Sequence, residues 1–257
     1  MKTRYLIALV TAFATLALTC FPMQASELDK RIEASAKDLY VFQTFLKGDD
    51  VKIHSVDGVV TLTGTVANEP RSILAQETMA NVSGVKSVNN ELKIKGDNPA
   101  ENSDAWIDMR VKTMLLFHRG VSGIGTEVSV KDGTVTLRGE AANKAQKQLT
   151  TEYARDVDGV KDVINEMTVA KMPKAESQTV GEKIDDASIT SQVKLSLLFH
   201  RSTRVLKTQV KTEDGVVTLS GMARNEAEKE LVTKLVNDIN GVKNVMNKMI
   251  IEEPKIK

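Results

Sequence analysis

The sequence is poor in the residues on which several classes of protein depend. Its 257 residues include one cysteine, five prolines and only 4% aromatic residues. So few prolines exclude a collagen-like or proline-rich architecture. So few aromatic side chains argue against the base-stacking platforms that bind single-stranded nucleic acids. The 35 Lys and Arg residues nearly balance 34 Asp and Glu residues, for a formal net charge of +1. The chain therefore lacks the basic excess typical of a nucleic-acid-binding protein.

Residues 1–25 have the layout of a secretory signal peptide. A short basic start with Lys2 and Arg4 precedes an apolar run, Tyr5 to Ala17, that is too short to span a bilayer comfortably. We predict cleavage after Ala25 and export to the periplasm. Cleavage would remove two basic residues and no acidic ones, so the net charge would fall from +1 to −1.

Cys20 offers this segment an alternative fate, the attachment of a lipid. Lipoprotein signals resemble Leu-small-small-Cys, whereas Ala17-Leu18-Thr19-Cys20 has its leucine one place late and a threonine before the cysteine. We therefore favour cleavage after Ala25 over a lipid anchor. The mature chain would then contain no thiol, which excludes disulfides, thiolate metal sites and cysteine catalysis and suits an oxidising compartment.

The rest of the chain repeats one unit three times. The pattern Asp-Gly-x-Val-x-Leu-x-Gly occurs at residues 57–64, 132–139 and 214–221. The copies are offset by 75 and 82 residues, and the same offsets relate positions throughout each unit. Each unit is longer than the repeats of solenoid proteins, so we interpret the three copies as tandem domains. We place these domains at residues 29–94, 104–169 and 186–251.

Within each unit the spacing of apolar residues changes in a fixed order. In the second copy, Asp104 precedes a helical pattern and is expected to cap it, and two alternating runs flank Asp132-Gly133, a strong hairpin signal. A second helix should begin near Asn143 and end at Gly159, and Val163 to Val169 should form the last strand. The order αββαβ predicts an α+β fold, in which a mixed three-stranded sheet carries two helices on one face.

Glycines recur at matched places in the three copies, where we expect them to serve backbone geometry rather than chemistry. These structural glycines are Gly58, Gly64, Gly84, Gly133, Gly139, Gly159, Gly215, Gly221 and Gly241. No glycine-rich run leads from a strand to a helix, as a phosphate-binding loop would require.

The repeated motif resembles the BON domain family. Asp-Gly-x-Val-x-Leu-x-Gly, a second helix and then Gly-Val-x-x-Val-x-Asn look like that domain over essentially all of residues 29–251. The chain departs from the family in having three copies where most relatives have two. Its first copy is also looser, with Tyr40-Val41-Phe42-Gln43 in place of Leu115-Leu116-Phe117-His118. The resemblance implies a non-enzymatic protein linked to envelope integrity, osmotic stress and binding of anionic phospholipids.

The resemblance also points to candidate lipid-binding residues. In a two-copy relative that is an outer-membrane lipoprotein, the first helix of the second domain contacts lipid, and Asp104-Ala105-Trp106-Ile107 resembles the start of that helix. Trp106 is the only tryptophan, and the matched residues are polar, so we expect it off the core stripe and exposed. We predict that Trp106, Met109, Arg110 and Phe117 contact lipid. The alternative is that Trp106 covers a linker or a seam between domains.

Three histidines, His54, His118 and His200, invite a metal or acid–base interpretation, which their spacing does not support. His118 and His200 occupy the same place near the end of the first helix, each before an arginine, where cations complement a helix C-terminus. One such histidine per unit gives no zinc cluster, and no serine lies in a nucleophile elbow. We predict no catalytic residue, no cofactor, no metal and no small-molecule substrate.

The favoured hypothesis is a periplasmic protein whose domains contact phospholipid headgroups weakly and gain avidity because they are tethered. The alternative is a protein-binding or chaperone-like module for envelope proteins, which would bind extended clients at its sheet edges. Lipid binding should weaken as salt rises, whereas hydrophobic client binding should persist. A net charge near −1 after cleavage means that a local basic patch must attract anionic lipid.

Overall fold

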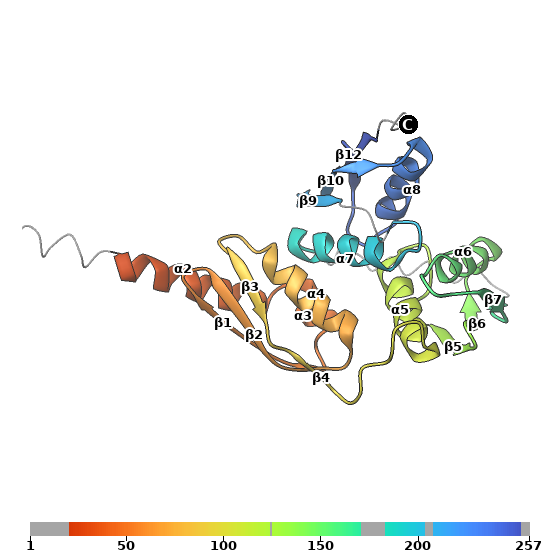
Figure 1. Cartoon of the computed structure of the whole chain (residues 1–257), viewed down its shortest axis with the longest axis horizontal. Helices are drawn as coiled ribbons and strands as arrows, with labels where there is room; N and C mark the ends of the chain where they lie inside the picture. Colours follow the sequence, from red (N-terminus) through yellow and green to blue (C-terminus); the bar gives the residue numbers. More distant parts are fainter. Residues whose placement is uncertain (1–20, 124, 171–182, 204–207, 253–257) are drawn as a thin grey trace, which may run out of the picture.

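The computed structural model describes residues 21–123, 125–170, 183–203 and 208–252. Over these ranges the chain forms three α+β units in tandem, domains 1 to 3, and the predicted fold class is confirmed (Figure 1). The predicted signal peptide, with Cys20, lies outside the described residues except for its last five residues. Those residues form the start of a helix, so the predicted cleavage point after Ala25 falls within that helix.

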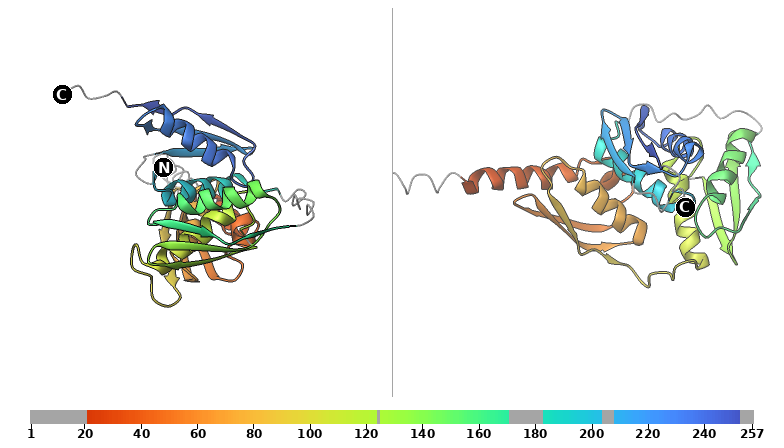
Figure 2. Two further views of the ribbon diagram at one scale, coloured as in Figure 1. Left: turned by 90° about the vertical axis from the view of Figure 1, so that its right-hand side faces the viewer. Right: turned by 45° about the horizontal axis from the view of Figure 1, so that its top comes forward.

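Domain 1 differs from the other two domains in its first helix. Helix α2 (Phe21–Ala36) ends early, and a short helix α3 (Tyr40–Thr44) follows after a break at which Leu39 is extended. The break coincides with the looser sequence of this copy. Figure 2 shows that α2 projects beyond the sheet. The remaining elements of domain 1 are β1 (Asp50–Val56), β2 (Val59–Val66), α4 (Glu69–Ala80), β3 (Ser87–Asn90) and β4 (Lys93–Ile94).

Domains 2 and 3 each have an unbroken first helix of 14 residues. The elements of domain 2 are α5 (Asp104–Phe117), β5 (Thr126–Lys131), β6 (Thr134–Ala141), α6 (Lys144–Arg155), β7 (Asp162–Asn165) and β8 (Thr168–Val169). Those of domain 3 are α7 (Asp186–Phe199), β9 (Gln209–Glu213), β10 (Val216–Ser220), β11 (Met222–Ala223), α8 (Glu226–Asn237), β12 (Asn244–Asn247) and β13 (Ile250–Ile251).

The main sheet of each domain is mixed, as the sequence predicted, and in domain 3 β11 and β13 form a separate parallel pair. In domain 2, β6 pairs antiparallel with β5 and parallel with β7, so that Val135 lies between Val130 and Val163. The last strand is not continuous, which corrects the single strand expected from Val163 to Val169. At the interruption the Asn165 side chain turns back to the main chain, and its Oδ1 accepts a hydrogen bond from the Met167 N–H at 2.9 Å. The same bond recurs in domains 1 and 3.

The aspartate at the start of each unit anchors the hairpin turn. Both turn residues have positive φ, +53° for Asp132 and +81° for Gly133, as a two-residue hairpin loop requires. Their N–H groups both donate to the Asp104 carboxylate at 2.8 Å. Asp104 is therefore not the helix cap that we expected. Ser103 caps α5 instead, with its hydroxyl accepting the Trp106 N–H at 3.3 Å.

All nine structural glycines have positive φ. Gly139 shows why no larger residue fits: its φ is +124°, and an added Cβ would lie 2.3 Å from the backbone oxygen of Gly125, the residue before β5. A side chain at this position would collide with main chain, which cannot move without breaking the ladder.

The second helix of each domain ends earlier than the sequence predicted. Helix α6 ends at Arg155 rather than at Gly159, and Asp156 is its C-cap. A further turn follows, closed by the Val160 N–H donating to the Val157 carbonyl at 3.2 Å. Gly159, with φ of +90°, lies in this extra turn and not at the end of the helix.

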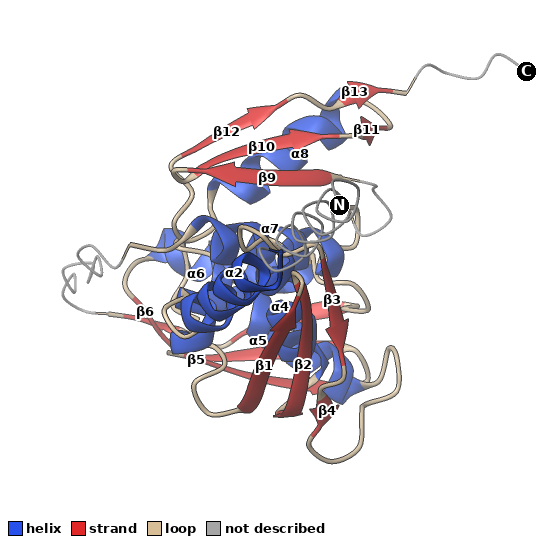
Figure 3. Ribbon diagram, turned by 90° about the vertical axis from the view of Figure 1, so that its left-hand side faces the viewer, coloured by secondary structure: helices blue, strands red, loops and turns tan. Residues whose placement is uncertain are grey.

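The three domains pack against one another through their helices, and the sheets lie at the periphery (Figures 1 and 3). The buried residues of domains 1 and 2 form one apolar cluster, which also takes in Leu195 and Phe199 of α7. The other apolar side of α7, with Ile189 and Val193, belongs to the core of domain 3. Helix α7 therefore serves two cores and joins all three domains.

Candidate functional site

The side chains predicted to contact lipid lie at the junction of the domains. Trp106 is 4% exposed, Met109 9% and Phe117 1%, so the expected exposure is wrong. The Arg110 guanidinium lies 3.5 Å from the centroid of the Trp106 ring and 4.5 Å from that of Phe199, which belongs to domain 3. Trp106 is therefore buried beside the seam with domain 3, which fits the alternative interpretation.

The copies differ at this position because each copy meets a different neighbour. Arg31 is exposed, whereas Ser188 is fully buried on the face of α7 that meets domain 1. Phe117 packs edge-on against Phe45 of domain 1, with ring centroids 5.4 Å apart. The difference between Trp106 and its matched residues therefore indicated a seam between domains in domain 2, not a solvent-exposed face. Lipid contact by these side chains stays a prediction, and it requires α5 to separate from its neighbours.

Domains 2 and 3 hold each other through a reciprocal contact, the interdomain clasp. The residues after α5 bind the end of α8, and the residues after α7 bind the end of α6. The Arg119 N–H donates to the Asp238 carbonyl at 3.0 Å, and the Arg201 N–H donates to the Asp156 carbonyl at 2.8 Å. These two bonds are related by the 82-residue offset of the copies. The clasp therefore has approximate two-fold symmetry.

The arginine side chains of the clasp bind the carbonyls at the end of α8 and in the extra turns that follow α8 and α6. The Arg119 guanidinium donates to the carbonyls of Asn237, Ile239 (3.3 Å) and Val242 (2.8 Å), and Arg201 donates to the Val160 carbonyl at 3.0 Å. The last carbonyls of a helix lack partners within the helix, and cations stabilise that end. The sequence predicted this role for cations on their own helix, which is wrong, because the arginines serve the neighbouring domain.

A buried polar cluster completes one half of the clasp. The His118 ring stacks on Tyr153 with centroids 3.9 Å apart, and His118 Nε2 lies 3.2 Å from Ser196 Oγ. The Tyr153 hydroxyl donates to Asp238 Oδ2 at 2.5 Å, and His118 Nδ1 lies 3.6 Å from the same oxygen, beyond ordinary hydrogen-bond range.

The environment of this cluster fixes its protonation. Burial lowers the pKa of His118, although the Asp238 carboxylate raises it in part. Burial also raises the pKa of Tyr153, and the carboxylate adds to that effect. Burial alone would raise the pKa of Asp238, but His118, the Tyr153 hydroxyl and Arg119 together lower it. At neutral pH the cluster therefore holds a neutral histidine, a neutral tyrosine and a carboxylate.

The other half of the clasp is simpler. His200 is also buried, and its Nε2 lies 3.6 Å from Asp156 Oδ2. Leu235 occupies the position that matches Tyr153, so this carboxylate has no tyrosine donor. Domain 1 has no clasp sequence, because Gln43-Thr44 stands where His118-Arg119 stands in domain 2.

Domain 1 has no clasp and contacts α7 through polar groups beside the shared apolar cluster. The Val41 N–H donates to Ser188 Oγ at 3.1 Å, and the Thr78 hydroxyl donates to Ser191 Oγ at 2.8 Å. These serines are buried, and their small side chains let α4 and α7 approach closely. The seam explains why one face of α7 is polar although it is covered.

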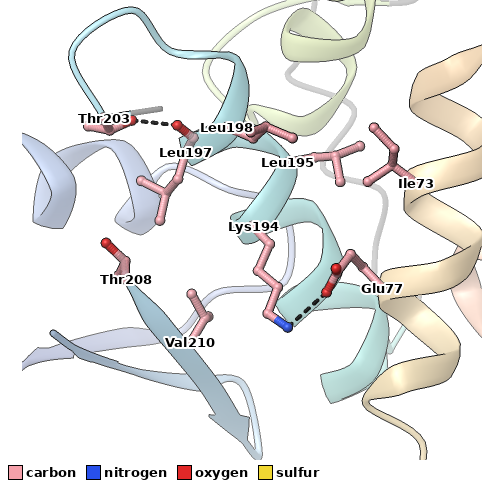
Figure 4. Close-up of a pocket in the computed structure, with 9 residues that line it drawn as sticks. All are labelled: Ile73, Glu77, Lys194, Leu195, Leu197, Leu198, Thr203, Thr208 and Val210. Carbon is pink, nitrogen blue, oxygen red and sulfur yellow. Dashed lines mark hydrogen bonds and ion pairs between the residues drawn. The ribbon is translucent and has the colours of Figure 1, made fainter. Parts of the chain in front are cut away.

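A pocket of about 230 Å³ opens beside this seam, between α4 and domain 3 (Figure 4). Lys194 Nζ lies 2.8 Å from Glu77 Oε2 across it, so these two charges neutralise each other. The other lining residues are mostly apolar: Ile73, Leu195, Leu197, Leu198, Thr203, Thr208 and Val210. The pocket is thus an apolar recess at a domain seam.

Two further observations concern membranes and metals. None of the helices in the described ranges combines the length and apolar character that crossing a bilayer demands. Across that same described part of the chain, no three His, Cys, Asp or Glu side chains gather closely enough to hold a metal ion. The described side chains form buried polar contacts between domains, namely the interdomain clasp and the contact of domain 1 with α7.

The fold and its seams define a protein of three tandem α+β modules. The BON domain family model matches residues 28–96, 103–171 and 185–253, and the chain belongs to that family. Over 144 residues it is 29% identical to Osmotically-inducible protein Y of Escherichia coli, covering 56% of this chain and 70% of that protein. Over 115 residues it is 30% identical to Outer membrane lipoprotein DolP of Haemophilus influenzae, covering 45% of this chain and 56% of that protein. The predicted family is confirmed.

Proposed function

We propose that the protein is exported to the periplasm, binds phospholipid membrane surfaces there and supports envelope integrity or osmotic tolerance without catalysing a reaction. The names of the two relatives, one osmotically inducible and one an outer membrane lipoprotein, support an envelope role. The observation that carries the proposal is the architecture. Helices face inward and sheets face outward, so each domain offers a broad outer sheet surface (Figure 3).

The packing of the domains changes the expected mode of binding. Tethered, independent domains would reach a membrane together and gain avidity. In the packed chain the three sheets point in different directions (Figures 1 and 3). A flat membrane therefore meets one sheet at a time, and one face must dominate the interaction.

Cosedimentation with lipid vesicles tests this function. The chain from Ser26 onward is mixed with vesicles of phosphatidylglycerol in phosphatidylcholine, and with phosphatidylcholine alone, at low and at moderate salt. We expect stronger binding to the anionic vesicles and weaker binding as salt rises, because salt screens headgroup charge. Absence of binding to every vesicle would refute the proposal.

A second candidate function is the binding of extended protein clients. Strand β9 lies at the edge of its sheet and pairs with β10 on one side only, and such edges accept added strands. Salt-resistant capture of an unfolded envelope protein, without vesicle binding, would favour this function over lipid binding.

A further inference from the structure

The three domains allow the same sheet face to be compared residue by residue within one chain. The outer face of each sheet is the one turned away from its helices. In domain 3 this face carries Met222, Met246 and Ile250, which are 52%, 44% and 70% exposed. The matched residues are Thr65, Asn89 and Lys93 in domain 1, and Glu140, Ile164 and Thr168 in domain 2. Only domain 3 has a large apolar side chain at all three positions.

These three side chains form one apolar stripe. Strand β11 pairs parallel with β13, which places Met222 beside Ile250. Strand β10 pairs parallel with β12, which places Thr218 beside Met246. Met246 and Ile250 each follow a residue that packs into the core of domain 3, Val245 and Met249, so both point away from the helices. The apolar stripe thus extends over β11, β12 and β13.

The apolar stripe is not needed for the core of domain 3. Val217 and Leu219, on the inner face of β10, are 0% exposed and already pack against the helices. Domains 1 and 2 have the same inner residues and form the same sheet with polar groups outside. Exposed apolar side chains that the fold does not need mark a contact surface.

The charges beside the apolar stripe favour an anionic partner. Lys248 lies between Met246 and Ile250 on the same face, where both other copies have a glutamate, Glu91 and Glu166. Lys211 of β9 is on this face too, but it lies 2.7 Å from Glu213, so these two charges neutralise each other and Lys248 supplies the net positive charge. Lysines beside an apolar strip suit a bilayer interface, because their stems lie along apolar surface while their ammonium groups reach phosphates.

The position of this face suits a flat partner. Figure 3 shows β9, β10 and β12 at one extremity of the molecule, with α7 and α8 on their inner side. We propose that this outer face is where an anionic phospholipid bilayer docks, with the apolar stripe entering the acyl boundary and Lys248 meeting headgroup phosphates. The proposal rests on the proposed function and names the surface that performs it.

Vesicle binding by the chain from Ser26 onward tests the surface. In the triple variant M222T/M246N/I250T each new residue is one that a sister domain already carries at the matched place, so the fold should tolerate it. We expect its partition coefficient on anionic vesicles to fall by about 30-fold or more, since three partly exposed apolar groups are lost. K248E should weaken binding about tenfold on anionic vesicles and leave binding to phosphatidylcholine unchanged. The matched control I164N, on the outer face of domain 2, should bind as the unmodified chain does.

The outcomes separate this surface from the function itself. If the unmodified chain binds and the triple variant binds equally well, the surface is wrong although the function stands. If the unmodified chain binds no vesicle, the function fails first. If the triple variant turns an oligomer into a monomer in light scattering and keeps its lipid binding, the face joins copies of the chain and the proposal is overturned. Circular dichroism and Trp106 fluorescence confirm that each variant is folded.

Discussion

The substitution Asp238→Ala tests the interdomain clasp. It removes the carboxylate that accepts the Tyr153 hydroxyl at 2.5 Å and lies 3.6 Å from His118 Nδ1. A hydrogen bond to a charged group contributes about 1.5–3 kcal/mol, and the half-buried tyrosine hydroxyl would lose its acceptor. We expect the free energy of unfolding of the paired domains 2 and 3 to fall by about 2 kcal/mol.

Trp106 provides the assay, because it is the only tryptophan and stacks on Arg110, whose guanidinium also lies over the Phe199 ring of domain 3. With an m value of about 2 kcal/mol/M, the urea midpoint of its fluorescence should move down by about 1 M. The matched control is Asp156→Ala. That side chain is 41% exposed and 3.6 Å from His200, so its midpoint should shift by less than about 0.3 M. Equal shifts, or no shift for Asp238→Ala, would refute the account of the clasp.

Two further predictions concern pH and backbone geometry. Burial lowers the pKa of His118. Below about pH 6.5 the unfolded chain therefore binds a proton that the folded chain does not. The free energy of unfolding should fall as the pH drops, by at most about 1.4 kcal/mol per pH unit. Urea midpoints between pH 5 and 8 should show this loss in the unmodified chain and less of it in H118Q; a midpoint that rises towards pH 5 would contradict it. Gly139→Ala forces a Cβ to 2.3 Å from the Gly125 oxygen at φ of +124°, and should cost about 2 kcal/mol or more. Gly48→Ala, with nothing within 4 Å, should stay within about 0.5 kcal/mol of the unmodified chain, and equal melting temperatures of the two variants would rule out this reasoning.

The fold was predictable because its signals are local. The Asp-Gly turn needs positive φ at both residues, and Asn143 caps α6 by accepting the Gln146 N–H at 2.8 Å. Both effects depend on a few adjacent residues, so the sequence states them directly. The end of the second helix was placed too late, because Gly159 is required by an extra turn that follows the helix.

The seams were not predictable in the same way, because they join residues far apart in the chain. The polar residues that match Trp106 in the other copies suggested solvent, whereas only Arg31 is exposed and both Ser188 and Trp106 are buried. A signal was nevertheless present. His118-Arg119 and Asp156 recur as His200-Arg201 and Asp238, whereas domain 1 lacks all three residues. A motif shared by two of three copies predicts a pairing between those two copies, and the clasp is that pairing.

The division between shared and divergent residues also explains what triplication achieves. Small domains bury a limited share of their surface and are marginally stable alone. The inner residues Val60, Val135 and Val217 are all 0% exposed, so the copies keep one core and vary at their seams and outer faces. Helix α7 receives support from domain 1 on one side and from the clasp at its end. The fold of domain 3 therefore does not depend on its outer sheet face, and that face can carry exposed apolar side chains.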